Sequence, residues 1–323
     1  MKKINITYKE YINSLNKNKL IEILDIYHIE YKKNQKKEVY ENLILDNLNN
    51  IVNYTIDLFQ NDEFINIKYI IKKKGYVKVK YNHLLLHFLN NLESKYLLKR
   101  ISDNEFVMPN EILNYYKLKI KNKSTNSTIK KNTEEYSLIL GFVNTYGVVE
   151  FDFFYQEYSK IYKLKKDEAI ERLNKLSTFY HEFNFFSDKK KDYLASIVIK
   201  DLKECKKYIK LPGEYKKYTN NELIDIYNFK YISKFRTYKK LYKFIDKNYN
   251  VSKGSFKVIN KYVLMPYIIN YECGNEKALE ILSELIDKYF EFNNDKYKEK
   301  FIKLVENLAK DYPSWRLKGL RGE

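Results

Sequence analysis

The stretch "LNKNKLIEILDIYHIEYKKNQKKEVYENLIL", from Leu15 to Leu45, contains two apolar-periodic segments on either side of a lysine-rich turn. Apolar residues recur at helical spacing on both sides, at Leu20, Ile23, Leu24 and Tyr27 before the turn and at Val39, Tyr40, Leu43, Ile44 and Leu48 after it. The link "HIEYKKNQKK" has a short extended pattern and then four lysines. Residues 1–50 are therefore predicted to form a helix, an extended link, a basic turn and a second helix.

This order, with the pattern L-x-x-I-L-x-x-Y-x-I followed by K-K-x-x-x-x-x-L, resembles the SAP-type fold and the N-terminal domain of the transcription terminator Rho. The resemblance implies that the turn and the start of the second helix face phosphates, a role that falls here on Lys32, Lys33, Lys36 and Lys37. A helix N-terminus also favours an anion. Such folds also serve as protein-binding modules, so both kinds of partner stay open for this segment.

Residues 51–116 are expected to form helices followed by a β-hairpin, an order typical of a winged helix. An apolar helical run from Leu85 to Leu92 breaks into "YLLKRI", a polar turn "SDNE" and "FVMP". The same order recurs over residues 134–200, with a break at Gly147 and the strand-like runs "HEFNFFS" and "YLASIVI". Its third helix, "KKDEAIERLNKL", is nearly charge-balanced, which favours a structural or protein-contact role over the reading of base edges.

The formal net charge of +18 is informative through its distribution. Only 5 of the 60 basic residues are arginine, and codons rich in A and T would by themselves supply much of the lysine. Residues 117–133 carry six lysines and no acid, and residues 201–261 carry 16 basic and 6 acidic residues, so these segments hold sixteen of the eighteen net charges. Such concentration favours a polyanion-binding surface.

We predict that residues 117–133 form a polar basic linker without helical periodicity. The residues in the two basic segments that we expect to contact phosphates are Lys121, Lys123, Lys130, Lys131, Lys206, Lys207, Arg236, Lys239, Lys240 and Lys243. In "FRTYKKLYKFI" the basic and aromatic residues interleave, a pattern that suits single-stranded nucleic acid. The rings also stand at the spacing of a buried helix face, so stacking and core packing both remain open.

Residues 201–323 are predicted to form a basic and then amphipathic helical domain. Its last helix carries Phe301, Leu304 and Leu308 and ends before Pro313. The tail "PSWRLKG" resembles a W-x-x-K-G element of a group of uncharacterised low-GC Gram-positive proteins, often chromosomal or phage-borne. There it closes a helical domain and commonly precedes a cysteine-rich SEC-C zinc motif, whose cysteines do not follow here. The resemblance implies no activity.

Motifs of catalytic or cofactor chemistry are missing from the sequence. It has no phosphate-binding glycine loop and no nucleophile elbow, so we expect neither an enzyme nor a cofactor. Cys205 and Cys273 lack zinc-ligand spacing, and His83 and His87 lack the glutamate of a zinc-protease helix, so no metal is expected. Neither a signal peptide nor a run of about 18 apolar residues occurs, which predicts a cytoplasmic chain without a membrane partner.

The sequence thus predicts a mainly α protein with small β-hairpins, built from a SAP-like N-terminus, two winged-helix-like modules joined by a basic linker, and a helical C-terminal domain. The leading hypothesis is a non-enzymatic nucleic-acid-binding protein of a bacterium or mobile element. It would bind DNA rather than RNA, mainly through phosphate contacts. The alternative is a protein-interaction module, such as a phage-encoded inhibitor or adaptor, whose basic face meets an acidic protein surface.

Overall fold

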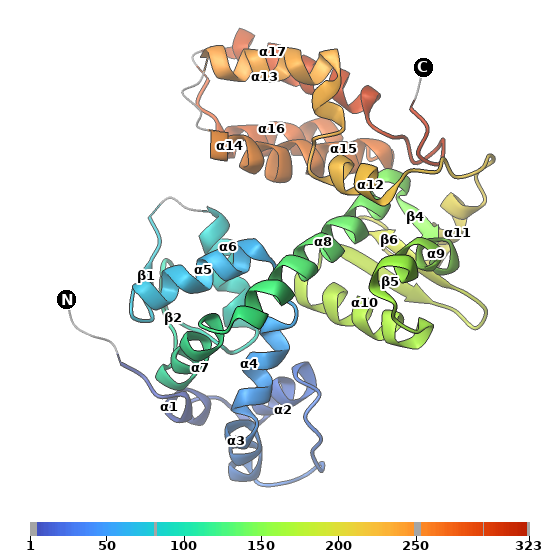
Figure 1. The fold of residues 1–323 in the computed structure, drawn as a ribbon. Helices are drawn as coiled ribbons and strands as arrows, with labels where there is room; N and C mark the ends of the chain where they lie inside the picture. Colours follow the sequence, from blue (N-terminus) through green and yellow to red (C-terminus); the bar gives the residue numbers. More distant parts are fainter. Residues whose placement is uncertain (1–4, 81–82, 249–252, 293, 322–323) are drawn as a thin grey trace. The chain divides into compact units, whose positions relative to one another are not determined.

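The computed structural model describes residues 5–80, 83–248, 253–292 and 294–321. The chain divides into two compact units, residues 1–134 and residues 135–323. Within the described residues both units are mainly helical, and each contains a three-stranded antiparallel sheet (Figure 1). This confirms the prediction of a mainly α protein with small β-hairpins.

Helices dominate the first unit. Its elements are α1 Tyr8–Asn13, α2 Lys17–Ile26, α3 Lys37–Asp46, α4 Leu48–Ile56, α5 Asn61–Lys72, β1 Tyr76–Lys78, α6 His83–Ser94, β2 Lys99–Ser102, β3 Glu105–Val107, α7 Asn110–Ile120 and the first half of α8 Lys123–Tyr146. Helices α2 and α3 are the two predicted from the opening stretch. The Asn16 side chain caps α2 by accepting from Lys19 N–H, and Leu20 and Tyr40 are fully buried on the facing sides of the pair.

The sheet of this unit has the order β1-β3-β2, and β2–β3 is the hairpin predicted near residues 97–108. Phe106 in the central strand lies opposite Val77 on one side and Arg100 on the other. A single helix, α6, stands between β1 and β2 in the chain. Strand β1 is not apparent from the sequence, because three residues are too few to display an alternating pattern.

The predicted linker at residues 117–133 is helical, so that prediction is wrong. Helix α7 ends at Ile120, and α8 begins at Lys123 and continues through the boundary between the units. The face of α8 that packs inward contains polar residues, because Thr125 and Asn132 are buried beside Ile129. Asn132 Nδ2 donates to the carbonyl oxygens of Asp57 and Phe59 at 2.9 and 3.0 Å, which a pattern of apolar residues cannot reveal.

The second unit begins within α8 and ends with the chain. Its further elements are β4 Val148–Glu150, α9 Phe151–Tyr162, α10 Lys166–Tyr180, β5 Phe183–Ser187, β6 Asp192–Ser196, α11 Leu202–Ile209, α12 Asn220–Tyr227, the 3₁₀ turn Ile232–Lys234, α13 Arg236–Asn248, α14 Lys253–Ile259, the π-helical turn Asn260–Leu264, α15 Met265–Glu272, α16 Ala278–Tyr289 and α17 Asp295–Asp311. The hairpin β5–β6 is the one predicted near residues 182–199.

Strand β6 is the centre of the second sheet, whose order is β4-β6-β5. Tyr193 and Ala195 share a buried cluster with Val148, Cys205 of α11 and Trp315 from the C-terminal tail. Leu194 between them is fully buried, and because side chains alternate along a strand it faces the opposite side, where α9 and α10 pack. The predicted domain boundary at residue 200 therefore falls inside this unit.

Candidate functional site

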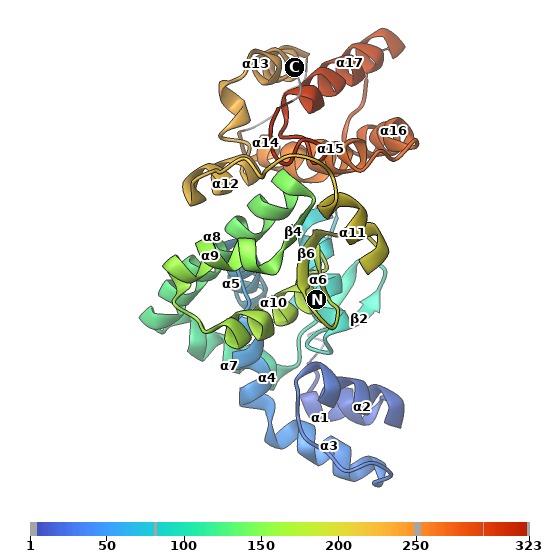
Figure 2. The ribbon, with the colours of Figure 1, turned by 90° about the vertical axis from the view of Figure 1, so that its right-hand side faces the viewer.

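Helices α13 and α17 pack side by side in antiparallel directions, as the two ribbon views show (Figure 1 and Figure 2). At one end of the pair, the Thr237 hydroxyl donates to the Asp311 carboxylate. At the other end, the Phe244 ring centroid lies 6.1 Å from that of Tyr297 and 6.4 Å from that of Phe301. These contacts bury one face of α13 and leave its lysine-rich face exposed.

A groove of about 520 Å³ runs along this helix pair, and we call it the lysine groove. Its lining residues are Lys240, Lys243, Phe244, Lys247 and Asn248 of α13 and Lys296, Tyr297, Lys300 and Leu304 of α17. All five lysines are exposed, and none of the residues that line the groove is acidic. Within the described residues the five ammonium groups form no ion pair with protein.

Helical spacing explains how the lysines converge. Lys240, Lys243 and Lys247 stand at i, i+3 and i+7, so they share one face of α13, and Lys296 and Lys300 stand at i and i+4 on α17. Each spacing brings like charges together within one or two turns, and such pairs destabilise a helix. The Lys300 Nζ lies 5.5 Å from the Phe244 ring centroid, which provides an aromatic face but no negative charge.

Two of the predicted site residues of α13, Lys240 and Lys243, line the groove, whereas Arg236 and Lys239 are exposed outside its lining. The groove lysines that sequence reasoning missed are Lys247, Lys296 and Lys300. Helical periodicity from Lys240 would have found Lys247. No pattern in the sequence predicts that α17 packs against α13.

The predicted residues near α11 and in the N-terminal turn are partly engaged with the protein. Lys206 pairs with Asp188 at 2.7 Å, and this contact holds the pKa of Asp188 well below its usual value, while Lys207 is exposed. Lys37 donates to the Asn13 carbonyl oxygen and pairs with Glu41 at 3.3 Å. The other three predicted lysines of the turn, Lys32, Lys33 and Lys36, are exposed.

The Tyr40 hydroxyl fixes the shape of that turn. It donates to the Lys32 carbonyl oxygen and accepts from the Gln35 N–H, both at 3.1 Å. These two hydrogen bonds tie the backbone on both sides of the turn to one buried side chain, so the exposed lysines lie on an ordered turn.

The predicted residues of the basic segment at 117–133 lie along two helix ends. Lys121 follows α7, and Lys123 opens α8. Lys130 lies 4.0 Å from Glu134, and Lys131 is exposed. None of these four lysines lines the lysine groove, whose lysines come from two helices that pack against each other.

Helix α10, the third helix of the predicted second winged-helix-like module, exposes Asp167, Glu168 and Glu171 near its start. Its arginine, Arg172, turns inward and pairs with the buried Glu135 at 2.7 Å. The Tyr158 hydroxyl donates to the same carboxylate. The guanidinium that could have contacted base edges is thus part of the internal packing.

The C-terminal tail "PSWRLKG" closes the second unit. The Trp315 indole is 1% exposed, and its Nε1 donates to the Asn144 carbonyl oxygen at 2.8 Å. Its ring covers Gly147, which has a φ of +72°, and the Tyr218 hydroxyl donates to the carbonyl oxygen of Gly319. These contacts give the W-x-x-K-G element a packing role.

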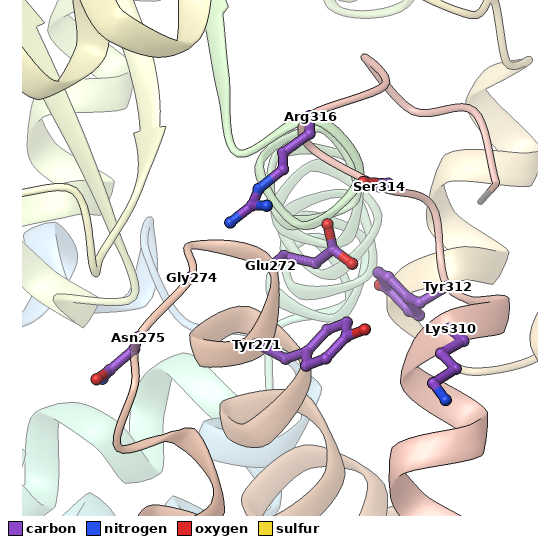
Figure 3. Close-up of a pocket in the computed structure, with 8 residues that line it drawn as sticks. All are labelled: Tyr271, Glu272, Gly274, Asn275, Lys310, Tyr312, Ser314 and Arg316. Carbon is purple, nitrogen blue, oxygen red and sulfur yellow. The ribbon is translucent and has the colours of Figure 1, made fainter.

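A second cavity, of about 700 Å³, lies beside this tail between the ends of α15 and α17 (Figure 3). The buried Glu272 carboxylate accepts from the Trp315 N–H at 2.9 Å, and burial raises the pKa of this carboxyl. Arg316 stands over Gly274, and Lys310 lies on the α17 side. Because Glu272 is already satisfied by the tail, we assign this cavity to the closure of the fold.

Metal and membrane features can be assessed for the described residues. No group of three or more His, Cys, Asp or Glu side chains there could hold a metal ion, and the side chain of His83 lies outside the described residues. Within the same residues, every helix is too short or too polar to cross a bilayer.

Comparisons with known protein families, with curated proteins and with solved structures found no match to this chain.

Proposed function

We propose that this chain is a non-enzymatic nucleic-acid-binding protein that holds its ligand mainly through phosphate contacts. The observation that carries the proposal is the lysine groove, in which five exposed ammonium groups from two helices surround a cavity without a carboxylate. Lysine is a point charge suited to phosphate oxygens, whereas bidentate recognition of bases usually employs arginine. Contacts of this kind position a nucleic acid without specifying its sequence.

In this proposal the rest of the second unit is the scaffold that carries the lysine groove. Helix, strand, helix, helix, strand, strand is the order of a winged helix, and β4 pairing with β6 agrees with that arrangement. Helices α9 and α10 are joined by the three residues 163–165, a length typical of helix-turn-helix connections. The inward Arg172 argues against the reading of base edges by α10.

The second candidate is a protein-interaction module that binds an acidic protein surface. The charge balance exposed on α10, where Asp167, Glu168 and Glu171 stand beside Lys165 and Lys166, favours it, because such a face suits a protein contact better than a row of phosphates. The two candidate functions predict different ligands for the groove. A phosphate backbone offers a regular row of charges, whereas a protein partner offers a particular shape.

The test is the salt dependence of binding to a labelled DNA oligonucleotide, measured by fluorescence anisotropy on the full chain. Five lysine–phosphate contacts predict a slope of log affinity against log salt of about −3.5 for a single strand and −4.5 for a duplex. The double variant Lys243→Glu and Lys300→Glu should bind much more weakly and lower the magnitude of the slope by at least about 1.4. The matched control is Lys277→Glu with Lys303→Glu, which makes the same charge change at exposed lysines outside the groove lining.

The control variant should lose only the small part of the affinity that belongs to the overall field of the protein. If the parent binds no DNA in low salt, or if both double variants lose affinity equally, the lysine groove is not a nucleic-acid site. The protein-interaction candidate then takes its place.

A further inference from the structure

We propose that the lysine groove holds one strand of nucleic acid and that the ligand is single-stranded, with an unpaired base stacked on Tyr297. This inference rests on the proposed function and assigns a substrate class to the same site. Two observations carry it, the arrangement of the five ammonium groups and the aromatic and apolar residues that line the groove with them. The usual spacing of packed helices adds a geometric argument.

The width favours a single chain over a duplex. Packed helices have axes about 8–10 Å apart, whereas the two backbones of a duplex stand on either side of a major groove about 12 Å wide. Both backbones of a duplex therefore cannot lie between the lysines of α13 and those of α17, whereas one strand can. The cavity of about 520 Å³ lies within the range of roughly 300–1,000 Å³ that is usual for small-ligand pockets, so it can admit part of one strand.

The ammonium groups flank the groove from both sides. Lys240, Lys243 and Lys247 extend over about 10 Å of α13, and Lys296 and Lys300 extend over about 6 Å of α17. A single backbone between these rows can meet lysines on both of its sides along a short path. A flat basic face would instead carry its lysines on one helix or spread them over several turns.

The aromatic and apolar residues that line the groove favour unpaired bases over a duplex. Phe244, Tyr297 and Leu304 line the groove together with the lysines, and the Tyr297 side chain is only half-buried. Unpaired bases expose their faces and stack on aromatic rings, whereas the faces of paired bases are covered by neighbouring base pairs. The buried Phe244 ring packs against Tyr297 with a 32° angle between the ring planes, and this contact supports the half-buried Tyr297 ring.

The aromatic residues expected from the sequence to stack do not serve this purpose. Tyr242 is stacked on Phe256 at 4.1 Å between ring centroids, and Tyr238 shares a hydrogen bond with Asn260. These rings belong to the packing of α13 against α14 and the π-helical turn that follows it. Of the two aromatic side chains that line the groove, Phe244 is buried, so Tyr297, which comes from α17, is the one available to a base.

The experiment compares three probes on the full chain at low salt: a labelled dT₁₅ strand, a 15-base-pair duplex, and a poly-glutamate peptide of fifteen residues. We expect dT₁₅ to bind at least about tenfold more tightly than the duplex. Tyr297→Leu, which keeps apolar volume but removes the ring, should weaken dT₁₅ about fivefold or more and leave the duplex unchanged. Tyr297→Phe keeps the ring and should bind dT₁₅ as the parent does. Thermal melting confirms that both variants fold.

The outcomes separate this inference from the proposed function. If the duplex binds as tightly as dT₁₅ and Tyr297→Leu changes neither, the single-strand inference is wrong while nucleic-acid binding stands. If no DNA probe binds, both fail. If poly-glutamate binds as tightly as dT₁₅ and is equally weakened by Lys243→Glu with Lys300→Glu, the groove accepts acidic polymers generally and the single-strand inference is again overturned.

Discussion

Replacing Gly147 by alanine should strongly destabilise the second unit. Gly147 has a φ of +72°, and a Cβ built there would lie 2.4 Å from Trp315 Cδ2. A left-handed conformation costs an alanine about 1–2 kcal/mol. Overpacking a buried site adds about 1–3 kcal/mol, because the indole must move away from its partners. We therefore expect the free energy of unfolding to fall by about 2–5 kcal/mol.

The matched control is Gly213→Ala. Gly213 also has a positive φ, +95°, but a Cβ there would meet nothing within 4 Å. Only the backbone cost, about 1–2 kcal/mol, should then appear. Trp315 is the only tryptophan of the chain and is 1% exposed, so its emission during urea unfolding reports on this unit. Equal losses in the two variants would refute the contact between Trp315 and Gly147.

Three further predictions concern single contacts. Asn132→Ala should lower the stability of the first unit by about 1–3 kcal/mol, seen by urea unfolding under far-UV circular dichroism, because the buried Phe59 carbonyl and the partly buried Asp57 carbonyl lose their donor. Burial raises the pKa of Glu272, so the folded chain binds this proton more tightly than the unfolded chain. The stability of the parent relative to Glu272→Gln should therefore fall as pH rises from the unfolded value near 4.5 through the raised folded pKa, and Trp315 emission during unfolding at several pH values measures this. Without ligand, Lys243→Glu with Lys300→Glu should melt no lower than the parent in low salt, since like-charge repulsion is relieved. Adding dT₁₅ should raise the melting temperature of the parent alone.

Local patterns in the sequence were sufficient for much of the fold. The spacing of Leu20, Ile23 and Leu24 predicts α2, and the turns "SDNE" and "DKKK" predict the two hairpins. Strand β4 escaped notice because a three-residue strand has no measurable period. The start of α8 has no apolar period that predicts a helix, because Thr125 and Asn132 face inward as polar residues, and the partners of Asn132 are Asp57 and Phe59, far away in sequence.

Sequence patterns predict only part of the candidate site. The exposed positions of Lys240 and Lys243 follow from the amphipathic period of α13. Lys296 and Lys300 come from residues 262–323, a segment with 10 basic and 11 acidic residues whose net charge of −1 gives no sign of a basic surface. They reach the groove because α17 packs against α13, through contacts such as those of Phe244 with Tyr297 and Phe301 and of Thr237 with Asp311.

Codon bias explains the number of lysines but not their placement. A lysine acquired by mutational bias is best tolerated where it is solvated or meets a carboxylate, as Lys166 meets Asp152 and Lys191 meets Glu150, each at 2.7 Å or less. The groove lysines repel one another at helical spacing, and among the residues that the structure describes they form no ion pair. A polyanion reverses the sign of that repulsion, because each phosphate it brings stabilises the ammonium groups on both helices. The arrangement is unfavourable for the free fold and favourable for a bound strand, which is why placement rather than net charge supports the proposed function.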